Sequence, residues 1–150
     1  MGAKLPVSVL VVIHTPALEV LLLERAARPG YWQSVTGSLQ RLDEPLAEAA
    51  AREVREETGI VAPPERLARW PLAYTFEIYP EWRWRFAPGT VYNTEHVFSL
   101  EVAAPAAPVL AADEHRAWRW LAWREAAALC FSWSNRDAIR LLGARANLER

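Results

Sequence analysis

Cysteine is almost absent from this sequence, which has a single one, Cys130, in 150 residues. One thiol cannot form a disulfide within the chain, and no two cysteines are present at the spacing of a zinc site. Both absences fit a reducing compartment. We therefore expect a cytoplasmic protein that has no structural disulfide.

A strong net charge and a long hydrophobic run are also missing. The formal net charge is −1 and the pI is near 6.3, which gives no electrostatic reason to expect a nucleic-acid or membrane partner. The longest apolar run, Val7 to Ile13, is interrupted by Ser8 and is far too short to span a bilayer. The N-terminus does not resemble a cleaved signal peptide. We expect no nucleic-acid and no membrane partner, and the residues predict no particular oligomeric state.

The composition that remains is typical of a folded domain. Hydrophobic residues make up 52% of the chain and charged residues 23%, which argues against disorder. This length is enough for one domain with a sizeable core, and no repeat or linker divides the chain. We therefore predict a single domain over residues 1–150.

Apolar and alternating segments predict an α/β protein. A β-branched run at 6–14 indicates a strand buried on both faces. At 82–86, aromatic residues alternate with arginines, which predicts a half-buried strand. The full set of predicted strands is 6–14, 19–25, 31–36, 73–79, 82–86, 91–102 and 118–120, and the predicted helices are 45–58, 124–130 and 135–146.

The most informative stretch runs from Gly37 to Ile60, which we interpret as a glycine turn followed by a helix. Asp43 or Glu44 can cap the N-terminus of this helix, and Pro45 suits its first position. Gly59 can adopt the left-handed conformation that closes a last helical turn. The helix is therefore expected to begin near Pro45 and to end at Gly59.

Two acids lie on the face of this helix that should pack against the sheet. At about 100° per residue, Glu53 and Glu57 share a stripe with Leu46 and Ala50, and Glu56 lies about 60° to one side. Two buried carboxylates repel each other, so we expect a cation between them, and Mg²⁺ prefers carboxylate and phosphate oxygens. An exposed helix whose acids pair with its own arginines is the alternative, which the apolar neighbours disfavour.

The segment Arg52–Ile60, REVREETGI, resembles the second half of the Nudix box, GX5EX7REUXEEXGU, where U is aliphatic. The distance from Glu44 to Arg52 also fits. Six residues rather than five separate Gly37 from Glu44, and Asp43 stands at the expected distance from Gly37. We interpret this departure as a one-residue insertion in the loop before the helix. A motif of this length is specific, and the resemblance implies the Nudix fold, an α/β/α sandwich with a mixed β-sheet.

The resemblance implies a Mg²⁺-dependent hydrolase of phosphoanhydrides, with Mn²⁺ as the other candidate ion. The implied metal ligands are Glu53, Glu56 and Glu57, together with the carbonyl of Gly37. Arg52 resembles the box arginine that orients a carboxylate. Catalytic roles are accordingly implied for Arg52, Glu53 and Glu57.

A further acid is expected from a loop outside the box. By resemblance, Glu114 in the segment Asp113-Glu114-His115 is assigned as water-activating base or additional metal ligand. Glu95 is the second candidate, provided that it lies on the sheet face toward the box helix. His96 and His115 are expected to be satisfied surface or loop histidines rather than metal ligands.

Segments outside the box resemble a Nudix subfamily that cleaves dihydroneopterin triphosphate. That reaction splits the α–β bond and releases dihydroneopterin monophosphate and pyrophosphate, a step of folate synthesis. By position, the resemblance implies substrate contacts at Lys4, Arg25, Thr36 and Ser132. The similar segments are 6–13, 32–38, 87–89, 93–95 and 132–136.

Three functions stay open at this stage. A small-molecule triphosphate is the expected partner in two of them: dihydroneopterin triphosphate is the leading substrate, and dATP or an oxidised nucleoside triphosphate is the alternative. A pterin or purine ring could stack on Trp32 or Trp133. The third function is a catalytically silent Nudix-fold binding module, which the presence of Glu53, Glu56 and Glu57 disfavours.

Overall fold

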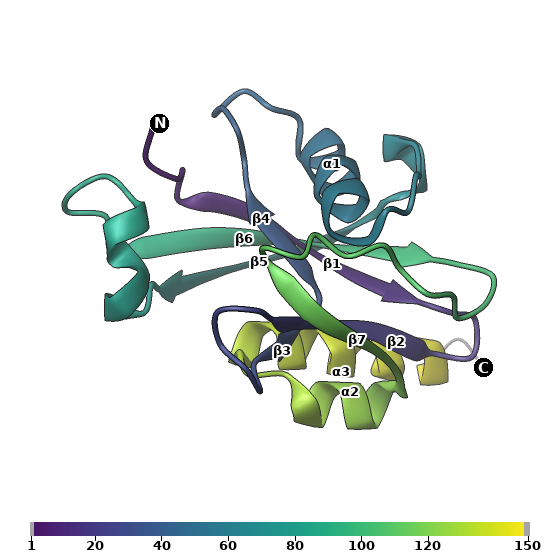
Figure 1. The fold of residues 1–150 in the computed structure, drawn as a ribbon. Helices are drawn as coiled ribbons and strands as arrows, with labels where there is room; N and C mark the ends of the chain where they lie inside the picture. Colours follow the sequence, from purple (N-terminus) through teal and green to yellow (C-terminus); the bar gives the residue numbers. More distant parts are fainter. Residues whose placement is uncertain (1, 149–150) are drawn as a thin grey trace.

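The computed structural model describes residues 2–148 and shows three layers. Helix α1 (Leu46–Thr58) covers one face of a mixed β-sheet, while α2 (Trp123–Leu129) and α3 (Trp133–Leu148) cover the other face (Figure 1). The predicted α/β class and the α/β/α sandwich are confirmed. No helix within the described residues is both long enough and apolar enough to cross a membrane.

Strand β1 (Val7–His14) lies at the centre of the sheet. It pairs in parallel with β6 (Tyr92–Glu101) and antiparallel with β4 (Val35–Ser38) at its start and β2 (Glu19–Arg25) at its end. The outer strands are β3 (Trp32–Gln33) and β7 (His115–Ala122), both beside β2, and β5 (Ala68–Glu77), beside β6.

The core has two apolar layers because successive residues of a strand point to opposite faces of the sheet. On β1, Val9, Val11 and Ile13 pack on the α1 side, whereas Leu10 and Val12 pack on the side of α2 and α3. All five side chains are buried. A strand covered on both faces therefore accounts for the β-branched run, and the prediction for 6–14 is confirmed.

Helix α1 ends as predicted but begins differently. Gly59 has φ +74°, and its N–H donates to the carbonyl of Arg55. At the other end, Pro45 is the capping residue, and no side chain of the described residues caps the helix. Glu44, one of the two predicted caps, is instead buried and accepts hydrogen bonds from Arg52.

The segment predicted as a strand at 82–86 is a 3₁₀ helix, η2 (Pro80–Arg85). The helix begins at a proline, and the N–H of Trp82 donates to the carbonyl of Tyr79 at 2.9 Å. The Trp82 ring packs edge-on against Tyr79 and Phe131, with centroids 5.1 and 6.0 Å apart. Alternation over so short a segment does not distinguish a strand from a tight helix.

Other differences concern the ends of elements. The predicted strand 31–36 is divided into β3 and β4, and β7 extends well beyond the predicted 118–120. Strand β5 starts before the predicted residue 73 and follows a short 3₁₀ turn, η1 (Pro64–Arg66). The predicted helices 124–130 and 135–146 correspond to α2 and α3.

Candidate active site

Helix α1 buries two carboxylates against β4. Glu53 is 9% exposed and Glu57 is 1% exposed, as their place on the apolar stripe predicts. Gly37 does not form the predicted turn, because it lies within β4 and pairs with Val9. A Cβ at Gly37 would overlap the carboxyl carbon of Glu53. Glycine is therefore needed here for the close approach of Glu53.

Arg52 connects α1 to the loop that precedes it. Its guanidinium donates to Glu44 at 2.9 and 3.1 Å, to Glu53 at 2.8 Å, to Glu56 at 3.4 Å and to the carbonyl of Ser38 at 3.3 Å. Burial alone would lower the pKa of Arg52, but the hydrogen bonds to Glu44 and Glu53 raise it. Arg52 is thus held as a cation that orients Glu53.

Glu57 has the least favourable surroundings for a carboxylate. Burial raises its pKa well above the usual value, and the Glu53 carboxylate raises it further. Burial also raises the pKa of Glu53, although Arg52 offsets part of this effect. One oxygen of Glu57, Oε1, is buried without a hydrogen-bond partner among the described residues. A positive group beside Glu57 would remove this cost.

Glu114 and His115 complete this acidic cluster. The ligand atoms of Glu57, Glu114 and His115 all lie within 4.8 Å of one another. His115 is 3% exposed, and its Nδ1, 3.7 Å from Oε1 of Glu57, has no hydrogen-bond partner in the described residues. The prediction of a satisfied surface or loop histidine is therefore wrong for His115. Burial lowers the pKa of this ring to about 4, so it is neutral at pH 7.

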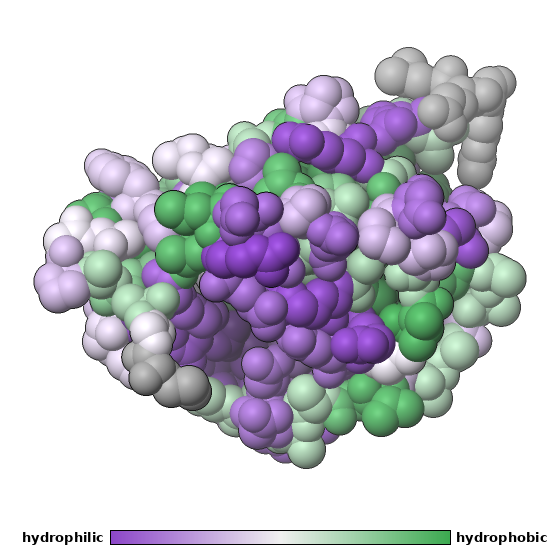
Figure 2. Space-filling view, turned by 90° about the horizontal axis from the view of Figure 1, so that it is seen from above, coloured by the Kyte–Doolittle hydropathy of each residue, from purple (hydrophilic) through white to green (hydrophobic). Residues whose placement is uncertain are grey.

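A cavity of about 430 Å³ opens beside these acids. Glu57, Glu114 and Gly37 line it, and a hollow surrounded by hydrophilic residues is visible on the face shown in Figure 2. Glu53 and Glu56 are not among the described residues that line it. The cavity brings together side chains that are far apart in the sequence.

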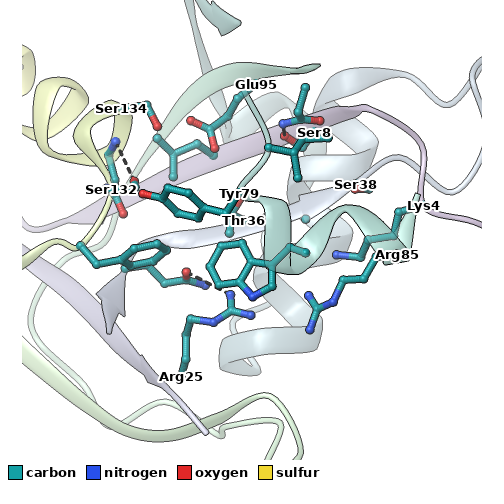
Figure 3. Close-up of a pocket in the computed structure, with 18 of the residues that line it drawn as sticks. Lys4, Ser8, Arg25, Thr36, Ser38, Tyr79, Arg85, Glu95, Ser132 and Ser134 are labelled. Carbon is teal, nitrogen blue, oxygen red and sulfur yellow. Dashed lines mark hydrogen bonds between the residues drawn. The ribbon is translucent and has the colours of Figure 1, made fainter. Parts of the chain in front are cut away.

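Three cations converge on the same cavity. Lys4, Arg25 and Arg85 line it, and Figure 3 shows Lys4 and Arg85 on one side, opposite Glu95 and Ser134. Burial lowers the pKa of Lys4 and of Arg25, and the nearby Arg85 lowers both further. Nε of Arg25 is buried without a hydrogen-bond partner in residues 2–148. Cations gathered in this way favour an anion of several charges.

Comparison with known proteins gives the family. The NUDIX domain family matches residues 4–142. The chain belongs to the Nudix family. It is therefore a hydrolase that acts on small-molecule phosphate compounds, and Nudix hydrolases use a divalent metal ion.

Relatives with a named activity cover most of this Nudix chain. It is 45% identical to the dihydroneopterin triphosphate diphosphatase of Escherichia coli K12 over 139 residues, 91% of each chain. The enzyme of that name from Haemophilus influenzae is 36% identical over 136 residues, covering 89% of this chain and 84% of the relative. The structure of the E. coli dihydroneopterin triphosphate pyrophosphohydrolase superposes with a TM-score of 0.86 at 42% identity, over 94% and 97% of the two chains.

The residues of this Nudix site fit a divalent cation. The buried Oε1 of Glu57 has no partner in the described part of the chain, and a second carboxylate, Glu114, reaches the same point. The close approach of Glu53 to Gly37 places another buried carboxylate there. Oxygen donors of this kind suit a hard cation.

Thr36 and Ser132, two of the four predicted substrate contacts, also line the cavity, as Lys4 and Arg25 do. Ser132 accepts a hydrogen bond from the N–H of Asn135 at 3.3 Å, so it caps α3 as well. The structure thus brings all four side chains to one place. Their contact with substrate stays a prediction.

Glu95 does not meet the condition set for the second catalytic acid. It lies on β6 two residues before Val97, whose side chain packs on the side of α2 and α3, so Glu95 faces away from α1. It lines the cavity on the side opposite the cations (Figure 3). Glu114 therefore remains the acid beside Glu57.

Several residues of the cavity were not found from the sequence. Tyr79, Trp82 and Phe131 form an aromatic wall, with Arg25 lying 4.8 Å from the centroid of the Trp82 ring. Of the two predicted stacking residues, Trp133 lines the cavity, but Trp32 is not among the described residues that do. The aromatic wall depends on η2, which the sequence pattern misassigned as a strand.

Proposed function

We propose that this Nudix hydrolase cleaves dihydroneopterin triphosphate to dihydroneopterin monophosphate and pyrophosphate, within one domain that spans residues 1–150. The observation that carries the proposal is the similarity to a dihydroneopterin triphosphate diphosphatase over 91% of both chains. The chemistry of the cavity agrees with it, because cations, carboxylates and aromatic rings all line it. The cations suit a charged chain of phosphates, and the aromatic rings suit a flat heterocycle.

The metal of this reaction is proposed to be Mg²⁺, or Mn²⁺ in its place. Its proposed ligands are Glu53, Glu56, Glu57 and Glu114, with the carbonyl of Gly37. When bound, such an ion neutralises phosphate charge and lowers the pKa of water. Arg52 holds Glu53 in place for this role.

The chain's own groups have distinct parts in the hydrolysis. A water oxygen forms a bond to phosphorus while the bridging P–O bond between the α and β phosphates breaks. The departing phosphate group takes the electron pair, and the water proton passes to a carboxylate, for which we propose Glu114. Lys4 and Arg25 are proposed to bind the phosphates, and Thr36 and Ser132 the polar groups of the substrate.

The test is kcat/KM with Mg²⁺ for dihydroneopterin triphosphate and for dATP, with the products identified. The proposal expects a clear preference for the pterin and release of pyrophosphate. Comparable or faster turnover of dATP would make the protein a general nucleotide pyrophosphohydrolase instead. No turnover of either substrate would overturn the proposal and favour a silent binding module.

A further inference from the structure

Two buried oxygen acceptors that have no partner among the described residues line the cavity. Glu95 and Asn93 are each 6% exposed, and both line the cavity. Oε1 of Glu95 and Oδ1 of Asn93 have no hydrogen-bond partner in the described residues. A buried acceptor left unpaired is costly. Both atoms therefore call for a donor that enters the cavity.

The surroundings of this pair are fixed by neighbouring strands and by α3. Ser8 on β1 pairs with Glu95 in the sheet, and its hydroxyl accepts a hydrogen bond of 2.8 Å from Nδ2 of Asn93. This bond uses one of the two N–H groups of Nδ2, and Oδ1 of Asn93 is left as a buried acceptor that a ligand could reach. Ser134 at the start of α3 lies beside Glu95 (Figure 3). The two acceptors are thus held by the scaffold.

The position of Glu95 indicates which part of a substrate it meets. Lys4 and Arg85 lie on the opposite side of the cavity from Glu95 (Figure 3). Phosphates are attracted to that side and repelled by a carboxylate. The heterocycle is therefore the part that reaches Glu95, and Asn93, two residues earlier on β6, lies on the same face of the strand.

The heterocycles of the candidate substrates differ in the hydrogen-bond donors along their edges. The pyrimidinone edge of a pterin, like that of guanine, carries a ring N–H next to an exocyclic amino group, so both neighbouring positions donate. The corresponding edge of adenine has an amino donor beside a ring nitrogen that accepts. A carboxylate has two acceptor oxygens and no donor, and it matches the first edge only.

We propose that Glu95, assisted by Asn93, is the specificity-determining group that accepts hydrogen bonds from the N–H edge of a 2-amino-4-oxopyrimidine ring. This inference rests on the proposed function, because it takes the phosphates to lie among the cations. Burial raises the pKa of the free Glu95 carboxyl to about 7. Two ring donors would compensate for that burial.

The decisive variant is Glu95→Gln, which keeps the size of the side chain but replaces one acceptor by an amide donor. Steady-state kinetics with Mg²⁺ would compare dihydroneopterin triphosphate, dGTP and dATP. dGTP and dATP form a matched pair, since they differ only in the base. We expect the ratio of kcat/KM for the pterin over dATP to fall by roughly tenfold to hundredfold, and the dGTP to dATP ratio to fall with it. The change should be mainly in KM, because Glu95 lies away from the phosphates.

A matched control is Glu101→Gln, which removes the same charge at the exposed end of the same strand. It should leave both ratios unchanged. If the wild-type enzyme turns over the pterin and Glu95→Gln leaves both ratios unchanged, the inference is overturned while the proposed function stands. An equal loss of kcat on all three substrates would also overturn it, because Glu95 would then act in the chemistry. Failure of the wild-type enzyme on the pterin would instead refute the proposed function.

Discussion

Glu57 is the side chain of the site whose charge is least favourable in the metal-free protein. It is almost fully buried, it faces the Glu53 carboxylate, and burial raises its pKa. Such a carboxylate is unfavourable for the free protein and useful only if a cation or a reacting group compensates for it. Replacing Glu57 should therefore lower turnover and raise the stability of the metal-free protein.

We predict that Glu57→Gln lowers kcat by at least roughly a hundredfold, the scale of losing a key electrostatic or acid–base group. In the absence of divalent ions the variant should be slightly more stable than wild type, because the like-charge repulsion with Glu53 is removed. Turnover and melting temperature measure the two effects. Glu48→Gln, at an exposed position of the same helix, is the control. Near-normal turnover of Glu57→Gln would place the catalytic role elsewhere.

A second prediction at the residue scale concerns stability and pH. Burial raises the pKa of Glu95 from 4.5 to about 7, so between these values the folded protein holds a proton that the unfolded chain has released. Its contribution to stability is complete below pH 4.5 and is lost as the pH rises through 7. Relative to wild type, Glu95→Gln should therefore gain stability as the pH rises, by up to about 3 kcal/mol at pH 8.

Thermal unfolding of both proteins without ligand, from pH 5 to pH 8, measures this difference. Glu101→Gln, at an exposed position of the same strand, is the control. A stability difference for Glu95→Gln that stays constant with pH would mean that Glu95 titrates normally.

The sequence could predict some site residues because their positions depend on one helix. Glu53 and Glu57 lie four residues apart on the apolar stripe of α1, and helical periodicity alone places them together. The role of Glu95 is different, because it depends on which face of β6 points toward α3. A change of one residue in strand register would turn Glu95 to the opposite face of the sheet, and the local sequence pattern does not predict the register.

At the scale of elements, the contact of α2 with α3 depends on a glycine. Gly143 is buried on α3, and a Cβ at this position would overlap the ring of Trp123 on α2. Alanine favours a helix over glycine by about 1 kcal/mol, whereas overpacking costs about 1–3 kcal/mol. The steric effect should therefore outweigh the helical preference.

We predict that Gly143→Ala lowers the melting temperature by a few degrees. In a Trp123→Ala background the same substitution should lose most of its cost or become stabilising, because the ring that the methyl group would overlap is absent. A double-mutant cycle of unfolding free energies measures this coupling. If Gly143→Ala stabilises the wild-type protein, the close contact does not restrict this position.

Elements were predictable from sequence to the extent that their pattern is local. The β-branched run of β1 and the glycine after α1 each identified an element, and both are confirmed. For η2 the pattern was misleading, because Trp82 alternates with arginines yet packs around Phe131 and Arg25 in a 3₁₀ helix. Those partners come from distant parts of the chain, so tertiary packing decided the structure of this segment.

At the scale of the whole molecule, the site exists only in the folded chain. Lys4 precedes β1, Glu57 lies near the end of α1, and Glu114 stands just before β7, yet all three line one cavity. A metal ion that needs both Glu57 and Glu114 binds the native state better than the unfolded chain. Its binding must then stabilise the fold as a whole.

This linkage gives a test of the metal site that does not depend on turnover. At Mg²⁺ concentrations about ten times Kd, the expected stabilisation is about 1.4 kcal/mol, which corresponds to a rise of roughly 3–5 °C in melting temperature for a chain of this size. Glu57→Gln should still melt cooperatively in the absence of the ion, but it should lose most of the rise. Glu48→Gln should keep the full rise. An equal rise in the Glu57→Gln variant would show that Mg²⁺ binds elsewhere, and no rise at millimolar Mg²⁺ in the wild-type protein would count against these carboxylates as its ligands.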